Sequence, residues 1–249
     1  MSGHSKWANI KHKKGKADAA RGKIFTKIGR EIAIVVREGG GDPAVNGKLR
    51  DVVAKARANN MPNDNIMRSI KKAAGEAGSV TYEQITYEGY APGGLAVIVD
   101  TVTDNRNRTA SEIRHVFDKN GGSLGTTGCV SYLFDSVGLI VLEAKPGMDE
   151  DEVMMAALEA GASDVQAQED CYEVYTQVQD FSAVREALEA QGFTFLSAEL
   201  TKIPQATNAI TDPEVLEKIG KLLEMLDDME DVQDVYHNGD LPEDEEEDD

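Results

Sequence analysis

The sequence predicts an α+β protein of three domains: an all-helical N-terminal domain followed by two α+β domains, one ferredoxin-like and inserted in the other. Three observations carry this prediction. Helical periodicity dominates up to Gly75, strand-rich segments begin after Gly78, and a complete βαββαβ pattern starts at Gly138. The 249 residues, 41 % of them hydrophobic, suffice for two or three modest cores.

The first part of the chain is predicted to be a basic arm followed by three helices. Residues 1 to about 20 are polar and lack apolar periodicity, which is typical of an arm that does not pack alone. The helices are predicted over 23–38, about 45–58 and about 64–74. In the first helix, apolar side chains share one arc and cations the opposite one, although Ile34 falls on the cationic side. The run from Gly39 to Pro43 ends this helix, because glycine suits the left-handed cap and proline cannot continue the helix.

The next segment has a β-β-α-β pattern. Strands are predicted over 82–90 and 95–103, joined by a turn at Pro92, Gly93 and Gly94. A helix over about 106–119 and a strand over 130–135 complete the pattern, with a glycine-rich link between them.

A second α+β pattern begins at Gly138 and looks self-sufficient. Its expected elements are strands over 139–143, 164–168, 171–178 and 193–201, with helices over 150–160 and 181–191. The helix 213–229 and strand 232–237 that follow are too small to stand alone, whereas the earlier β-β-α-β pattern lacks one helix and one strand. The predicted domains are therefore 1–79, then 80–136 with 204–240, then 137–203 as the insertion, followed by a disordered acidic tail over 241–249.

Charge is segregated along the chain. The first 75 residues carry 17 Lys and Arg against 6 Asp and Glu, and the remaining 174 carry 9 against 39. The formal net charge of -19 for the whole chain does not reveal this division. A segregated chain can present a basic face to a polyanion while its acidic part is repelled.

The candidate nucleic-acid contacts follow from this basic region. Dense lysines and arginines contact phosphates and release counterions, which gives sequence-independent affinity. The alternative is a solvated basic tail, and Trp7 could either stack on a base or pack on the protein's own surface. The predicted contact residues of the region are Lys6, Trp7, Lys11, Lys13, Lys14, Lys16, Arg21, Lys23, Lys27 and Arg30.

A further candidate lies where a strand passes into the helix 106–119. Arg106 and Arg108 fall in the first turn, where the helix dipole disfavours cations. Free amides and two guanidinium groups would suit a phosphate or carboxylate. A local salt bridge from Arg108 to Glu112 or Asp104 is the alternative.

Other classes of function receive no support. Cys129 and Cys171 lie far apart in the sequence and belong to no CxxC motif, so neither a disulfide scaffold nor a zinc site is expected. Metalloprotease, hydrolase and nucleotide-binding motifs are absent, and the glycines of 121–128 fit no cofactor loop, so no cofactor and no enzymatic activity are predicted. Without a membrane span or secretory signal, the expected location is cytoplasmic. The oligomeric state is left open.

Several long motifs resemble the YebC family of bacterial and organellar proteins over nearly the whole chain. They are GHSKWANIKHKKGKADAARGKIFTKIGREI, YEGYAPGG, TDNRNRT, GGSLGTTGCVSYLF and DVQDVYHNGD. The resemblance implies a helical domain followed by two α+β domains and no cofactor. It also implies a DNA-binding transcriptional regulator, or a translational activator at the ribosome that relieves stalling at proline-rich stretches. Ala91, where glycine is more usual, and the long acidic end depart from the family.

The function predicted is a non-enzymatic, nucleic-acid-binding regulator of gene expression. Its basic residues are mostly lysines, which contact phosphates as point charges, so backbone recognition of DNA or ribosomal RNA is favoured over a sharp base code. Two other hypotheses remain: an acidic protein-docking module, and a phosphate-processing enzyme that uses Arg106 and Arg108. The acidic tail could also compete with the arm for nucleic acid.

Overall fold

The computed structural model describes residues 19–75, 80–145, 147–168 and 170–241. The chain divides into two units. One contains the described part of residues 1–79 together with Ser136–Thr201, and the other contains Val80–Asp135 with the described part of the chain from Lys202 onward.

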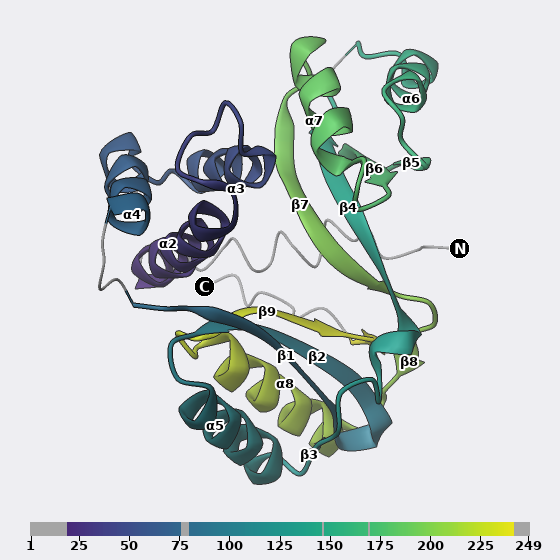
Figure 1. The fold of residues 1–249 in the computed structure, drawn as a ribbon. Helices are drawn as coiled ribbons and strands as arrows, with labels where there is room; N and C mark the ends of the chain where they lie inside the picture. Colours follow the sequence, from purple (N-terminus) through teal and green to yellow (C-terminus); the bar gives the residue numbers. More distant parts are fainter. Residues whose placement is uncertain (1–18, 76–79, 146, 169, 242–249) are drawn as a thin grey trace. The chain divides into compact units, whose positions relative to one another are not determined.

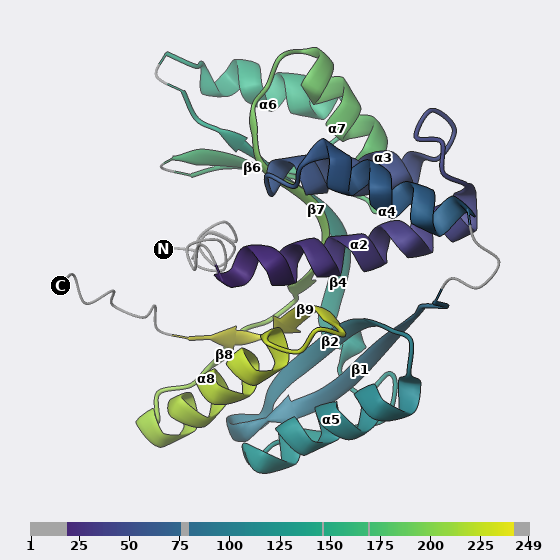
Figure 2. The same cartoon turned by 90° about the vertical axis from the view of Figure 1, so that its left-hand side faces the viewer.

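The first unit begins with a helical domain of three helices. They are α2 (Ala19–Gly39), α3 (Gly47–Ala58) and α4 (Asn63–Gly75), and they pack on one another as Figure 2 shows. The apolar positions of each helix meet in one core, which includes Ile28, Ile32, Leu49, Ile66 and Ile70. The three predicted helices are therefore confirmed, with α2 beginning slightly earlier than expected.

The turn between α2 and α3 is fixed by glycine and by one buried asparagine. Gly40 has a φ of 84° and donates its amide to the carbonyl of Val36 at 2.8 Å, which closes the end of α2. The amide nitrogen of Asn46 donates to the carbonyls of Val35 and Gly40, and its oxygen accepts from the amide of Leu49. Asn46 thus caps α3 and ties it to the end of α2.

The rest of the first unit is a ferredoxin-like domain. Its elements are β4 (Phe134–Glu143), α6 (Glu150–Glu159), β5 (Asp164–Ala167), β6 (Cys171–Thr176), α7 (Phe181–Ala190) and β7 (Phe195–Pro204). The strand order β5-β6-β4-β7 is the split βαβ arrangement that the sequence predicts. Helices α6 and α7 lie on one face of the sheet (Figure 1), where Val153, Val174 and Leu188 share a core.

The second unit is an α+β domain built from two distant parts of the sequence. Its elements are β1 (Glu83–Ala91), η1 (Pro92–Gly94), β2 (Leu95–Thr103), α5 (Arg106–Lys119), β3 (Ser123–Leu124), β8 (Asn208–Ala209), α8 (Pro213–Asp227), β9 (Val232–His237) and β10 (Gly239–Asp240). The main sheet has the order β3-β1-β2-β9, with α5 and α8 side by side against it (Figure 1). Strand β9 joins this sheet after the chain has built the ferredoxin-like sheet, as the predicted insertion requires.

Gly89 explains part of the YEGY motif in β1. A Cβ at this position would lie 2.6 Å from the carbonyl oxygen of Ser123 and 2.8 Å from the ring of Phe117. Both distances are too short for a carbon side chain, so β1 approaches β3 and α5 at this point only because the residue is glycine.

The predicted strand over 130–135 is wrong. Ser131–Leu133 is the 3-10 turn η2, the strand that pairs with β1 is Ser123–Leu124, and β4 pairs with β6 from Gly138 onward. The cause is the buried carboxylate of Glu88, which accepts hydrogen bonds from the amides of Gly128, Val130 and Ser131 at 2.7, 2.8 and 2.8 Å. These amides are therefore directed to a side chain and not to a neighbouring strand.

Burial opposes ionisation of Glu88, but the three amide donors outweigh it and hold the pKa of this carboxyl below its ordinary value. The carboxylate remains charged at neutral pH and fixes the loop that follows the glycine-rich link. The end of the glycine-rich link is thus held in place by the side chain of Glu88.

Candidate nucleic-acid interface

Six of the predicted contact residues lie outside the described residues. They are Lys6, Trp7, Lys11, Lys13, Lys14 and Lys16. Their role stays a prediction from the sequence.

The predicted cations of α2 are partly covered by protein. Arg21 and Lys23 are exposed, whereas Lys27 and Arg30 are half-buried. Each of these four side chains takes part in an interaction with another group. Ile34, which the helical wheel places on the cationic side, is buried at 8 % exposure. The cationic face of α2 is therefore less open to solvent than an isolated amphipathic helix would be.

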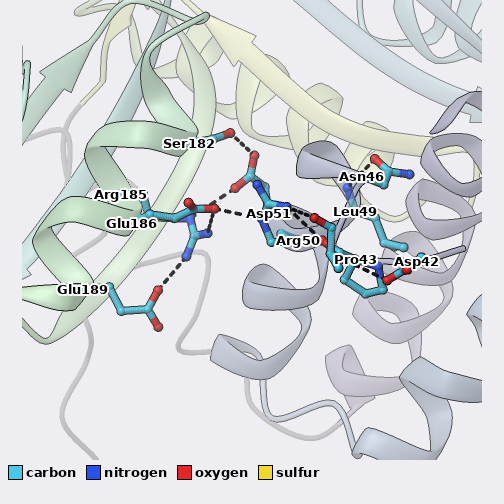
Figure 3. Close-up of polar contacts among 11 residues, drawn as sticks. Asp42, Pro43, Asn46, Leu49, Arg50, Asp51, Ser182, Arg185, Glu186 and Glu189 are labelled. Atoms are coloured by element: carbon cyan, nitrogen blue, oxygen red, sulfur yellow. Dashed lines mark hydrogen bonds and ion pairs between the residues drawn. The ribbon is translucent and has the colours of Figure 1, made fainter. Parts of the chain in front are cut away.

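Three of the four cations of α3 form ion pairs with glutamates, whereas Arg57 is exposed and donates to Asn63. Arg50 donates from Nε to Glu186 at 2.9 Å, and its Nη1 donates to the carbonyls of Pro43 and Ala44 (Figure 3). Lys48 pairs with Glu38 and Lys55 pairs with Glu31, each at 2.8 Å. A phosphate approaching these residues would compete with a carboxylate already in place.

An arginine of α7 completes the contact with α3. Arg185 donates from Nε to Asp51 at 3.2 Å and from Nη1 to Glu189 at 3.0 Å, and its Nη2 lies 3.7 Å from Glu186. Ser182 donates its hydroxyl to the second oxygen of Asp51 (Figure 3). Because the Arg185 side chain is only 6 % exposed, this cation holds the helical domain to the ferredoxin-like domain and is not available to a ligand.

Helix α4 differs from α2 and α3. Arg68, Lys71 and Lys72 are exposed, and none of the three forms an ion pair with any residue in the described ranges. Their i, i+3, i+4 spacing places them on one side of the helix, opposite Ile66 and Ile70 in the core. These three cations are not among the contact residues predicted from the sequence. Their i, i+3, i+4 spacing is the sequence pattern from which this cationic side of the helix could have been predicted.

Arg108, at the start of α5, is held by two carboxylates. Its Nη2 donates to Asp104 at 2.9 Å and to Asp231 at 2.8 Å, so the predicted alternative of a salt bridge to Asp104 is present. Hydrogen bonds from Arg108 to Asp231 and then to Asp104 raise the pKa of this guanidinium above its ordinary value. Its charge is shared with two acids, which lowers its availability to an added anion.

Asp231 is the buried centre of this cluster. It accepts hydrogen bonds from Thr103 at 3.0 Å and Thr109 at 2.7 Å, in addition to Arg108. Burial raises the pKa of Asp231, but the hydrogen bonds from Arg108, Thr109 and Thr103 outweigh burial and lower it. The cluster fastens the turn before β9 to the end of β2 and the start of α5.

Arg106 is exposed in the first turn of α5, next to the Asn105 cap, whose oxygen accepts from the amide of Arg108. Its guanidinium makes no ion pair with a described residue. Arg106 is thus the cation of this junction that is open to an anion. The junction belongs to the second unit and the cations of α2 and α4 to the first.

The described residues show neither a metal-binding cluster nor a membrane-spanning helix. No three His, Cys, Asp or Glu side chains within them are grouped so as to hold a metal ion. None of the described helices is both long enough and apolar enough to cross a membrane.

Comparison with known proteins identifies relatives over the whole described chain. A probable transcriptional regulatory protein of Acetivibrio thermocellus is 61 % identical over 238 residues, which are 96 % of this chain and 98 % of that protein. One of Ruminiclostridium cellulolyticum is 58 % identical over 247 residues, covering 99 % of this chain and 100 % of the relative. The crystal structure of a conserved hypothetical protein from Aquifex aeolicus superposes with a TM-score of 0.84 at 48 % identity, covering 96 % of this chain and 98 % of that one.

Two family profiles cover most of the sequence. Residues 5–76 match the TACO1/YebC protein N-terminal domain, and residues 82–239 match the TACO1/YebC second and third domain. The order of the matches is that of the helical domain and the two α+β domains. The chain therefore belongs to the TACO1/YebC family.

Proposed function

We propose that this protein is a non-enzymatic regulator of gene expression that binds the phosphate backbone of nucleic acid through its basic N-terminal region, with DNA at promoters as the principal target. The charge distribution carries the proposal: 17 Lys and Arg against 6 Asp and Glu in residues 1–75, followed by a strongly acidic remainder. The naming of the relatives as probable transcriptional regulatory proteins supports the same class of function.

The chemistry required is electrostatic. Each lysine or arginine that neutralises a phosphate releases condensed counterions, and this gain is independent of base sequence. The arm lysines, the exposed Arg21 and Lys23 of α2, and Arg106 supply such contacts, while Arg108 holds the start of α5 in place through Asp104 and Asp231. No bond is made or broken in this scheme, and no cofactor takes part.

Ribosomal RNA is the second candidate target, with translational activation as the function. Of the 17 cations in residues 1–75, 11 are lysines. Lysine contacts a phosphate as a point charge and does not read base edges bidentately, so the same surface suits folded RNA as well as duplex DNA.

Crosslinking in cells, followed by sequencing of both DNA and RNA, tests the proposal. Enrichment at promoters that requires Lys6, Lys11, Lys13, Lys14 and Lys16, tested by replacing all five with Gln in the full chain, supports the DNA form. Enrichment on ribosomal RNA with no DNA signal contradicts the DNA form and supports translational activation instead. Crosslinking to neither nucleic acid above background overturns the proposed function.

A further inference from the structure

The outward side of α4 is a cationic surface that forms no ion pair with the described part of the chain. Arg68, Lys71 and Lys72 lie within one turn of helix, so they span about 6 Å along its axis. Asp64, the acidic residue of α4, lies one turn before Arg68 and is not paired with it. Met67 lies beside these cations and is 51 % exposed.

The other helices of the domain offer only single exposed cations without an ion pair to a described residue, Arg37 on α2 and Arg57 on α3, and no cluster like that of α4. Four α2 cations, Arg21, Lys23, Lys27 and Arg30, have interaction partners, and Lys27 and Arg30 are half-buried, so that Arg37 is the one exposed cation of this helix for which no partner is described. Lys48, Arg50 and Lys55 of α3 each pair with a glutamate. A cation that already has a carboxylate partner has less to gain from a phosphate, because the existing ion pair must be given up. The three α4 cations have no ion pair with a described residue to give up.

We infer that the outward face of α4, formed by Arg68, Lys71 and Lys72, is a docking surface for the phosphate backbone of double-helical nucleic acid. The surface fits a polyanion through charge complementarity, since three unpaired cations on one helix side can each meet a phosphate. The inference rests on the proposed nucleic-acid function and locates a contact surface for it within the ordered helical domain. Met67, at the edge of the surface, can cover sugar carbons without adding charge.

A matched pair of variants tests this inference in the full chain. The test variant combines Arg68→Gln, Lys71→Gln and Lys72→Gln, and glutamine keeps a helix propensity close to that of the residues replaced. The control combines Arg114→Gln, Lys119→Gln and Lys218→Gln, which are exposed cations on α5 and α8. Both variants lose one arginine and two lysines, so their net charge is the same.

Fluorescence anisotropy with labelled 20-base-pair duplexes of DNA and of RNA, titrated over a range of NaCl concentrations, gives the readout. We expect the α4 variant to reduce the slope of log K against log salt by about 2 to 3 and the affinity at 0.1 M salt on the order of 100-fold. The control should retain the wild-type slope. If the α4 variant loses affinity for one duplex alone, the surface binds that nucleic acid. If it loses affinity for both equally, the surface binds the phosphate backbone that the two duplexes share.

Three results would overturn the inference. An α4 variant that keeps the wild-type slope and affinity, while the five arm substitutions reduce them, removes α4 from the interface and leaves the proposed function intact. If the α4 variant and the control variant lose affinity and salt slope equally, the effect comes from net charge alone. A wild-type protein that binds neither duplex with salt dependence overturns both the inference and the proposed function. Circular dichroism at 222 nm checks that both variants keep their helices.

Discussion

Helix α4 and the contact between α3 and α7 both concentrate basic side chains, but they use them in opposite ways. At the α3–α7 contact, Arg185 is 6 % exposed and lies among three carboxylates. On α4, Arg68, Lys71 and Lys72 are exposed and have no ion-pair partner among the described residues. A buried, paired cation holds parts of the protein together, whereas an exposed, unpaired one is available to a polyanion. The surroundings of a cation, and not its residue type, decide which of these roles it has.

The largest effect on stability is expected from Arg185→Met. Methionine has a similar length but cannot donate, so Asp51 keeps only the hydroxyl of Ser182, and the acids around the site lose their common cation. Removing one partner of a buried ion pair costs about 3 kcal/mol. We expect a lower urea midpoint, followed by circular dichroism, and an unchanged salt slope for duplex binding.

The double variant Arg185→Met, Asp51→Leu is the control for this prediction. Replacing both partners by apolar residues removes the unpaired carboxylate, so it should recover at least half of the lost stability. A single variant as stable as the wild type, but weaker in nucleic-acid binding, would contradict the division of roles drawn above.

An intermediate effect is expected at the Arg108 cluster, where an exposed arginine is tied to a buried acid. In Asp231→Asn, the amide cannot replace the charged acceptor of three hydrogen bonds, so the variant should lose about 2 kcal/mol at pH 7. The pKa of Asp231 is lowered by folding from its ordinary value of 3.8, so its ionised form stabilises the protein above that pH. This contribution is lost as the pH falls through the still lower pKa of the folded state.

Thermal denaturation at pH 7 and at several values between pH 5 and pH 2.5 measures this effect. The difference between wild type and Asp231→Asn should be largest at pH 7 and should shrink as the pH falls below about 4. A difference that stays constant over the whole range would mean that the charge of Asp231 is not the source of the stability.

The sequence predicts the helices and the ferredoxin-like order well because these depend on local periodicity. The three helices around Ile32, Leu49 and Ile70 each show a clear apolar face, and the βαββαβ pattern is continuous in the chain. The error at 130–135 arose because Glu88, some 40 residues away, takes the amides that a strand would need. Periodicity holds no information about such a distant acceptor.

The candidate interface could be predicted only in part, because the sequence does not show which cations have partners far away in the chain. Charge density pointed to the basic region, but the partners of Arg108 and Arg50 include Asp231 and Glu186, which lie 123 and 136 positions away. Only the folded chain shows that these arginines are engaged. The α4 face, in contrast, was visible as an i, i+3, i+4 pattern and needed only the burial of Ile66 and Ile70 to show that it points outward.

The smallest effect is expected where an exposed lysine is already paired. The ion pair between Lys48 and Glu38 joins side chains that are 73 % and 50 % exposed, so Lys48→Gln should change stability by no more than about 0.5 kcal/mol. Its salt slope for duplex binding should change by well under about 1, because Glu38 already neutralises the lysine. Lys71→Gln, also a single charge removed from an exposed helix position, should change the slope by about 1. Equal slopes for these two variants in the same anisotropy titration would show that pairing within the protein does not decide which lysines contact the nucleic acid.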